Sequence, residues 1–250
     1  MCKMITALFP AADMPSKDYD IDGLASYLHL TPQQVDRLVN RGRLPGRKVG
    51  GQWRFSHSEI HHWMEERMGV LDDDELAHVE GVLEKASHPE QLDTISISGK
   101  LPVEAIDLNL PARTRGKVIS AMVDLAAQSG HVWDPKALAD AVRAREEMQP
   151  TAMDNGVALL HPRRPMPTIL AQPLLALGRV EGGIPFGGAG GILTDVFLLI
   201  CSTDDTRHLR VLARLARLLS DGTLLDEIRS SDDPEHVWRQ IAQREEPLIG

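Results

Sequence analysis

The chain has 250 residues, of which 42% are hydrophobic and 25% are charged, and its formal net charge is −9. This composition is ordinary for a folded globular protein, and it excludes a fibrous repeat, a disulfide scaffold and long disorder. Neither Cys2 nor Cys201 stands in a paired motif, and no apolar stretch reaches the roughly 18 residues that a bilayer-spanning helix needs. We therefore expect a cytoplasmic protein of two domains without a membrane segment, in which residues 1–20 form a flexible tail.

Residues 21–68 have the pattern of a small helical module. Leu24 and Leu28 recur at helical spacing, and the run Thr31-Pro32-Gln33-Gln34 supplies an N-cap, an early proline and a capping-box glutamine. A second helix is therefore predicted to begin at Thr31 and to end before Gly42, where a left-handed C-cap glycine belongs. Gly50-Gly51 between two short alternating runs predicts a hairpin, and Ser56-His57-Ser58-Glu59 predicts the start of a third helix.

The same module concentrates positive charge. Residues 37–58 include six basic residues and no acidic one, so the remaining chain holds 21 basic against 36 acidic residues, a balance of −15. A local basic surface on an acidic protein indicates nucleic-acid binding, and the alternative is a solvated basic face on a protein-binding module. The six residues are Arg37, Arg41, Arg43, Arg47, Lys48 and Arg54.

The run LASYLHLTPQQVDRLVNRGRLPGRKVGGQWRFSHSEIHHWMEE resembles the excisionase-type winged helix-turn-helix family, which is related to the MerR-type DNA-binding domains. The resemblance implies DNA as a partner, with the second helix in the major groove and the hairpin on the adjacent backbone. It also suggests a homodimer. Base contacts are then expected from Gln33, Gln34 and Arg37, because glutamine and arginine can read base edges. Phosphate contacts are expected from Arg43, Arg47, Lys48 and Arg54, and Arg41 shares their surface.

Two histidines of the third helix have the spacing of metal ligands. His57 and His61 are four residues apart, but no third ligand follows at a recognisable spacing. We therefore interpret them as solvent-facing histidines and predict no metal site. Residues 69–93 follow with an acidic run and a short apolar periodicity, which predict an acidic helical linker.

Sheet and helix patterns alternate from residue 94 to about residue 246, which is typical of a layered α/β domain. The glycines between residues 182 and 191 predict a hairpin rather than a phosphate-binding loop, because no Lys-Ser/Thr follows them. Arg210, Arg214 and Arg217 recur opposite the leucines of the long helix, and this pattern predicts a solvated face. Strands are predicted at 106–110, 156–160, 174–180 and 194–201, and helices at 115–128, 135–148, 206–219, 224–230 and 234–243.

Residues 154–162 predict a turn, a buried strand and then a histidine, His161, at the end of the strand. Together with residues 110–148 and 196–221, this segment resembles the fructose/mannitol-type enzyme IIA domain of the phosphoenolpyruvate-dependent phosphotransferase system, including its nitrogen-regulatory branch. The resemblance implies a mixed sheet flanked by helices and no cofactor. It also implies that His161 accepts a phosphoryl group from the histidine-containing carrier protein. Arg145 then corresponds to the active-site arginine and His208 to the supporting second histidine, and both can bind phosphoryl oxygens.

The two resemblances together predict a DNA-binding regulator that senses sugar or nitrogen status through phosphorylation of His161. The chain departs from the family pattern, which usually reads Gly-Asn-Gly before the strand and Pro-His-Gly at its end. We expect Asp154 to add an acid near the site and Pro162 to remove a backbone N–H beside His161, where the chain reads Leu160-His161-Pro162. Two alternatives stay open: a plain phosphocarrier of a phosphotransfer chain, and a binding module that is not phosphorylated.

Overall fold

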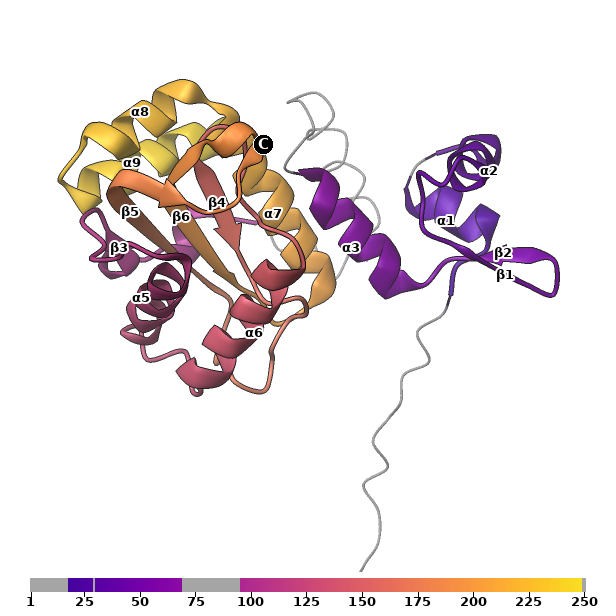
Figure 1. Cartoon of the computed structure of the whole chain (residues 1–250), viewed down its shortest axis with the longest axis horizontal. Coiled ribbons are helices and arrows are strands. Elements are labelled where there is room, and N and C mark those ends of the chain that lie inside the picture. Colours follow the sequence, from indigo (N-terminus) through magenta and orange to yellow (C-terminus); the bar gives the residue numbers. More distant parts are fainter. Residues whose placement is uncertain (1–17, 29, 69–94, 249–250) are drawn as a thin grey trace, which may run out of the picture.

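The computed structural model describes residues 18–28, 30–68 and 95–248 (Figure 1). Most of the predicted tail and the whole predicted linker, residues 69–93, therefore lie outside the described residues. None of the helices that the structure describes combines the length and the apolarity of a bilayer-spanning segment.

The N-terminal module contains three helices and a hairpin. Helix α1 spans Ile21–Tyr27, α2 spans Pro32–Asn40, strands β1 and β2 span Arg47–Val49 and Gln52–Arg54, and α3 spans His57–Met68. The predicted capping box of α2 is present, since the Thr31 side chain accepts from the Gln34 backbone and the Gln34 side chain accepts from the Thr31 backbone. The helix ends as predicted, because Gly42 adopts a φ of +66°.

Each helix of this module contributes at least one residue to its core, and so does the segment that follows the hairpin. Leu24 of α1, Val35 of α2, Phe55 after β2 and Ile60 of α3 are all fully buried. Trp63 of α3 packs against this cluster, and its indole N–H donates a 2.8 Å hydrogen bond to the backbone oxygen of Arg43. Helix α3 is therefore an integral part of the N-terminal fold.

The C-terminal part is an α/β domain around a mixed four-stranded sheet. Its strands are β3 (Ile106–Asp107), β4 (Val157–Leu160), β5 (Leu174–Pro185) and β6 (Leu193–Cys201), in the order β3-β5-β6-β4. The β3–β5 and β4–β6 pairs are parallel, and the central β5–β6 pair is antiparallel. Helices α5 (Arg115–Ala127), α6 (Pro135–Met148), α7 (Asp205–Ser220), α8 (Gly222–Ser230) and α9 (Pro234–Glu245) complete the fold, with short 3-10 turns η2 (Ser98–Lys100), η3 (Val103–Ala105), η4 (Ala189–Gly191) and η5 (Glu246–Leu248).

Helices cover both faces of the sheet, and the residues of each strand pack alternately against one face and the other. On β4, Val157 and Leu159 pack in one apolar cluster with α7, α8 and α9, whereas Ala158 and Leu160 pack in a second cluster with α5 and α6. Successive strand residues point to opposite faces, so a fully apolar strand requires helices on both sides. The predicted α/β class, with a mixed sheet flanked by helices, is thus confirmed (Figure 1).

Two strands differ from their predicted bounds. Strand β3 ends at Asp107 rather than at residue 110, where the Leu110 N–H instead donates to the Arg179 backbone oxygen. Strand β5 continues to Pro185, because a register shift between Arg179 and Ile184 absorbs the glycines and lets pairing with β6 resume. The predicted hairpin between residues 182 and 191 is confirmed by this antiparallel pairing.

The arginines of α7 do not form the predicted solvated face. Arg210 and Arg214 are only 4% and 2% exposed. The Arg214 guanidinium donates a 3.1 Å hydrogen bond to the backbone oxygen of Ile95, the first described residue after the linker. The pattern of α7 was misinterpreted because its arginines are buried by contacts with other parts of the chain, such as the Ile95 backbone, which the periodicity of one helix does not reveal.

The two parts of the structure meet along α3. This helix lies beside α7 and separates the C-terminal domain from α1, α2 and the hairpin (Figure 1). Apolar residues of the N-terminal module and of the α7 to α9 layer join in one continuous cluster. Helix α3 therefore contacts both parts of the molecule.

Candidate functional site

His161 follows the last residue of β4 and is 2% exposed. Its Nδ1 lies 2.7 Å from the backbone oxygen of Leu159. Because a carbonyl oxygen only accepts, Nδ1 must carry a proton, so the lone pair of a neutral imidazole at this position is on Nε2. Nε2 is buried and has no hydrogen-bond partner among the described residues, so the structure presents it as a nucleophile or a ligand.

His208 lies in the first turn of α7, which is capped by the Asp204 side chain. Its Nδ1 is 2.9 Å from the Ser202 hydroxyl, and its Nε2 is a second buried nitrogen without a described hydrogen-bond partner. The ring centroids of His208 and His161 are 5.1 Å apart. Burial, aided by the neighbouring His161, lowers the pKa of His208 to about 3, so this imidazole is neutral at physiological pH.

Arg145 lies in the last turn of α6 and is 3% exposed. Its Nη1 donates a 2.7 Å hydrogen bond to the Gln149 backbone oxygen, while its Nε has no described hydrogen-bond partner. The positive charge of the guanidinium also contributes, as the smallest cause, to the low pKa of His208. The structure thus gathers the three residues that the sequence analysis selected at one end of the sheet.

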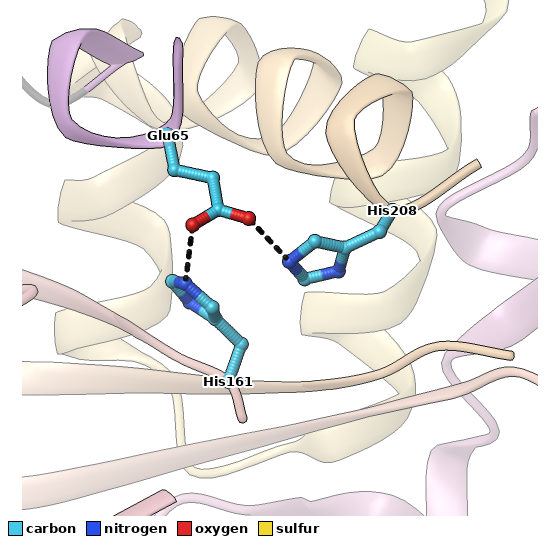
Figure 2. Close-up of side chains that lie close together, drawn as sticks. All are labelled: Glu65, His161 and His208. Carbon is cyan, nitrogen blue, oxygen red and sulfur yellow. Dashed lines mark ion pairs between the residues drawn. The ribbon is translucent and has the colours of Figure 1, made fainter. Parts of the chain in front are cut away.

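Glu65 of α3 is the residue of this site that the sequence analysis missed (Figure 2). Its Oε2 lies 3.9 Å from His161 Nε2, its Oε1 lies 3.7 Å from His208 Nε2, and its side chain is 5% exposed. Burial opposes ionisation of the carboxyl group, but the nearby imidazoles of His161 and of His62, whose Nδ1 lies 3.3 Å from Oε2, outweigh burial and lower the pKa of Glu65 to about 2. The site therefore holds an ionised carboxylate from another part of the chain.

One face of α3 brings Glu65 to this position. His57, His61 and Glu65 follow one another at intervals of four residues, and the His57 and His61 rings lie 4.0 Å apart. His61 is not solvent-facing as predicted: it is 5% exposed and its Nε2 is 2.9 Å from the Tyr27 hydroxyl. Desolvation also lowers the pKa of His61 to about 3. The prediction was wrong because Tyr27 of α1 contacts His61 and because α7 packs against α3.

A second buried carboxylate adjoins the site. Glu146, next to Arg145 in α6, is 1% exposed, and it accepts hydrogen bonds from the backbone N–H and the hydroxyl of Thr151. Burial raises the pKa of Glu146 above its ordinary value, although the hydrogen bonds from Thr151 and the charge of Arg145 oppose this effect. Glu146 therefore fixes the loop that leads from α6 towards β4.

Glu65, His161 and His208 also have the composition of a metal site. One ligand atom from each lies within 4.8 Å of the others, and zinc accepts two histidines and a carboxylate. The buried guanidinium of Arg145 acts against this possibility, because its field opposes a divalent cation and favours an anion. We therefore treat the space between the imidazoles as an anion site.

Asp154 does not lie at the site as predicted. The turn that contains it precedes β4, whereas His161 follows β4, so the two residues stand at opposite ends of an extended strand. The turn is held by Arg229, whose guanidinium donates to the Asn155 backbone oxygen at 2.7 Å and to Asp195 at 2.8 Å. The turn thus has a structural environment of its own. Pro162, by contrast, directly follows His161 and is buried.

The candidate DNA-contacting residues cluster on α2, on the turn after it and on the hairpin. Several are engaged within the protein: Gln34 in the capping box, Arg47 in a 2.5 Å ion pair with Asp18, and Lys48 over the ring of Trp53 at 4.9 Å. Arg54 is half-buried and donates to the Gln52 side chain. Exposed residues of the set are Gln33, Gln34, Arg37, Arg41, Arg43, Arg47 and Lys48.

Family comparisons match both parts of the chain. The family described as phosphoenolpyruvate-dependent sugar phosphotransferase system, EIIA 2, matches residues 100–244, and a helix-turn-helix domain family matches residues 19–68. The fructose-specific EIIA component of Haloferax volcanii is 25% identical over 154 residues, which cover 61% of this chain and 98% of the relative. The nitrogen regulatory protein of Bradyrhizobium diazoefficiens is 28% identical, covering 53% and 88%. A match to the fructose-specific EIIABC component of Bacillus subtilis, at 24% identity, covers 60% of this chain but only 24% of that protein.

Solved structures agree on the fold. The nitrogen regulatory protein IIA-Ntr from Neisseria meningitidis superposes with a TM-score of 0.53 at 19% identity, covering 58% of this chain and 98% of that one. The mannitol IIA protein of Escherichia coli gives 0.52 at 20% identity, covering 57% and 99%. At these identities the likeness concerns the α/β fold of the C-terminal domain alone.

Proposed function

Because the chain belongs to the phosphoenolpyruvate-dependent sugar phosphotransferase system EIIA 2 family and joins this domain to a helix-turn-helix domain, we propose that it is a DNA-binding regulator whose His161 accepts a phosphoryl group. The observation that carries the proposal is the state of His161. Its Nδ1 is held by the Leu159 carbonyl, and its Nε2 is left with a free lone pair beside a second imidazole and a buried guanidinium.

The proposed transfer is a displacement at phosphorus. The Nε2 lone pair of His161 forms the new N–P bond, and the N–P bond of the phosphorylated carrier breaks with its electron pair returning to the carrier's imidazole. The Nδ1 proton of His161 stays on the ring, where the Leu159 oxygen stabilises the positive charge that develops as the lone pair is used. The exchange therefore needs no metal and no additional general base in its balance.

The surrounding groups serve the phosphoryl oxygens. The Arg145 guanidinium supplies the positive charge, and its buried Nε has hydrogen-bonding capacity left. His208 supplies an imidazole nitrogen that becomes a donor when it is protonated, and phosphoryl charge favours that protonation. Arg145 and His208 are thus proposed as phosphoryl-binding residues, and His161 as the acceptor.

The partners that we propose are DNA, the histidine-containing carrier protein and a second copy of the chain. DNA would meet α2 and the hairpin through the exposed basic residues described above. Sensing of sugar or nitrogen status would follow from the fraction of His161 that is phosphorylated. A mannitol IIA protein of Escherichia coli has been solved in complex with phosphorylated IIB, so an EIIB-type partner is proposed for the same site of this chain.

Intact-mass analysis tests the acceptor. The full chain is incubated with phosphoenolpyruvate, enzyme I and the cognate carrier protein, beside His161→Ala and beside a known enzyme IIA as a positive control. We expect one phosphoryl group on the wild-type chain and none on His161→Ala. An unlabelled wild-type chain beside a fully labelled control protein would refute the proposal and favour a binding module that is not phosphorylated. Onward transfer from His161 to an acceptor protein would instead indicate a phosphocarrier.

A further inference from the structure

The carboxylate of Glu65 lies in the space that a phosphoryl group on His161 would need. Its two oxygens face the two buried Nε2 atoms at 3.9 and 3.7 Å (Figure 2). These distances are longer than hydrogen bonds, and neither nitrogen has another hydrogen-bond partner among the described residues. A phosphoryl group bonded to Nε2 of His161 would project its oxygens into the volume that the carboxylate fills.

Glu65 belongs to the helix-turn-helix domain. The same helix buries Ile60 and Met64 in the core of that domain, and it places Glu65 against His161 and His208 of the EIIA domain. A movement of α3 away from the EIIA domain would therefore withdraw the Glu65 carboxylate from the site and carry the DNA-binding domain with it. In this arrangement α3 is docked on the EIIA domain, where it lies along α7 (Figure 1).

We infer that α3 docks over the phosphorylation site with the Glu65 carboxylate in place of the phosphoryl group, and that phosphorylation of His161 expels this helix. The inference rests on the proposed function and names the segment of the chain that the phosphoryl group displaces. The anion site of the EIIA domain can then hold either the Glu65 carboxylate or the phosphoryl group on His161. The DNA-binding domain is docked only while Glu65 occupies the site.

Charge and volume both support the exclusion. A phosphoryl group brings between one and two negative charges at neutral pH, and Glu65 is ionised. Arg145 contributes a buried positive charge that acts on His208, and Glu146, the next residue, contributes a second buried carboxyl group. A phosphoryl group and the Glu65 carboxylate in the same space would therefore repel each other.

The same competition protects His161 from the carrier protein while α3 is docked. His161 is 2% exposed in this arrangement, so a donor cannot reach Nε2 without movement of α3. Phosphorylation therefore requires the undocked state, and its rate follows the population of that state.

The test measures phosphorylation and helix protection in the full chain. Glu65→Gln keeps the shape of the side chain and removes its charge, whereas Glu59→Gln changes an exposed residue of the same helix and serves as the matched control. We expect Glu65→Gln to be phosphorylated about tenfold faster than the wild type at limiting carrier, and Glu59→Gln to match the wild type. Circular dichroism checks that both variants are folded.

Hydrogen exchange of the wild-type chain gives a readout that needs no variant. We expect the amides of residues 57–68 to lose protection when the wild type is phosphorylated and to keep it in His161→Ala under the same treatment. Equal phosphorylation rates in the wild type, Glu65→Gln and Glu59→Gln, with unchanged protection of α3 after phosphorylation, would overturn the inference and leave the proposed function intact. A wild-type chain that stays unphosphorylated with excess carrier, beside a fully labelled control enzyme IIA, would instead refute the proposed function.

Metal analysis tests the alternative that Glu65, His161 and His208 bind a metal ion. One metal ion per purified chain that is lost in Glu65→Gln would show that the carboxylate is a ligand, and it would overturn the proposed exchange with a phosphoryl group. A metal-free chain that phosphorylates as described supports the exchange.

Discussion

The buried neutral state of His208 has a consequence for stability that depends on pH. Burial lowers the pKa of His208 in the folded protein from its ordinary value of 6.5 to about 3, so the unfolded chain binds more protons between these two values. The free energy of unfolding therefore rises with pH across this window and falls as the solution is acidified below about pH 6.5.

The size of the effect follows from the lost proton affinity. Each pH unit below the unfolded pKa costs about 1.4 kcal/mol for a group that stays neutral in the folded state. At pH 5.0, which is 1.5 units below 6.5, His208 alone should cost about 2 kcal/mol relative to pH 7.5. His61, whose pKa is also about 3, should add a comparable loss.

The assay compares denaturant unfolding of the wild type and of His208→Asn at both pH values. Asparagine keeps a polar group near the Ser202 hydroxyl, which lies 2.9 Å from His208 Nδ1, but it does not titrate. The stability difference between the two proteins should change by about 2 kcal/mol in favour of the variant on acidification. His236→Asn, at a half-exposed histidine paired with Glu227, is the matched control. An identical difference at pH 7.5 and pH 5.0 would refute the assignment of a buried neutral His208.

Three further outcomes are expected. Gly156→Ala should destabilise the EIIA domain by more than about 2 kcal/mol in thermal unfolding, because φ is +84° there and a Cβ would lie 2.8 Å from the Arg229 guanidinium; an unchanged midpoint would contradict this geometry. Glu245→Ala should cost about 3 kcal/mol in urea unfolding, because the fully buried carboxylate accepts hydrogen bonds from the backbone of residues 97 and 98; a loss below about 0.5 kcal/mol would argue against it. Arg41→Ala and Arg43→Ala should each lower the slope of log affinity for duplex DNA against log salt by about one, whereas Arg113→Ala, an exposed arginine of the EIIA domain, should leave the slope unchanged.

Local patterns predicted the elements of the fold closely. The bounds of α6 match because Asp134 and Pro135 mark its start and the apolar periodicity ends at Met148. The short β3 and the long β5 were harder to predict, since their ends depend on which backbone groups meet across the sheet.

The candidate site was predicted only in part, for a related reason. His161, Arg145 and His208 were selected together through the family resemblance, and the structure brings them to one place. Glu65 lies 96 residues before His161, and no spacing rule connects a helix of one domain to the strand end of another. The burial of His61 was also missed, because it depends on contacts with other helices, such as that with Tyr27 of α1, rather than on the periodicity of a single helix.

Helix α3 presents two functional faces with a fixed angular offset. Each residue along an α-helix turns the next by about 100°. A one-residue insertion between Met64 and Glu65 would therefore keep Ile60 and Met64 in the core of the helix-turn-helix domain and turn the carboxylate away from the EIIA domain. The angular position of Glu65 relative to the core residues of α3 thus determines whether the two domains can dock. A protein that joined the same two domains with a different helical phase would not dock them through this carboxylate.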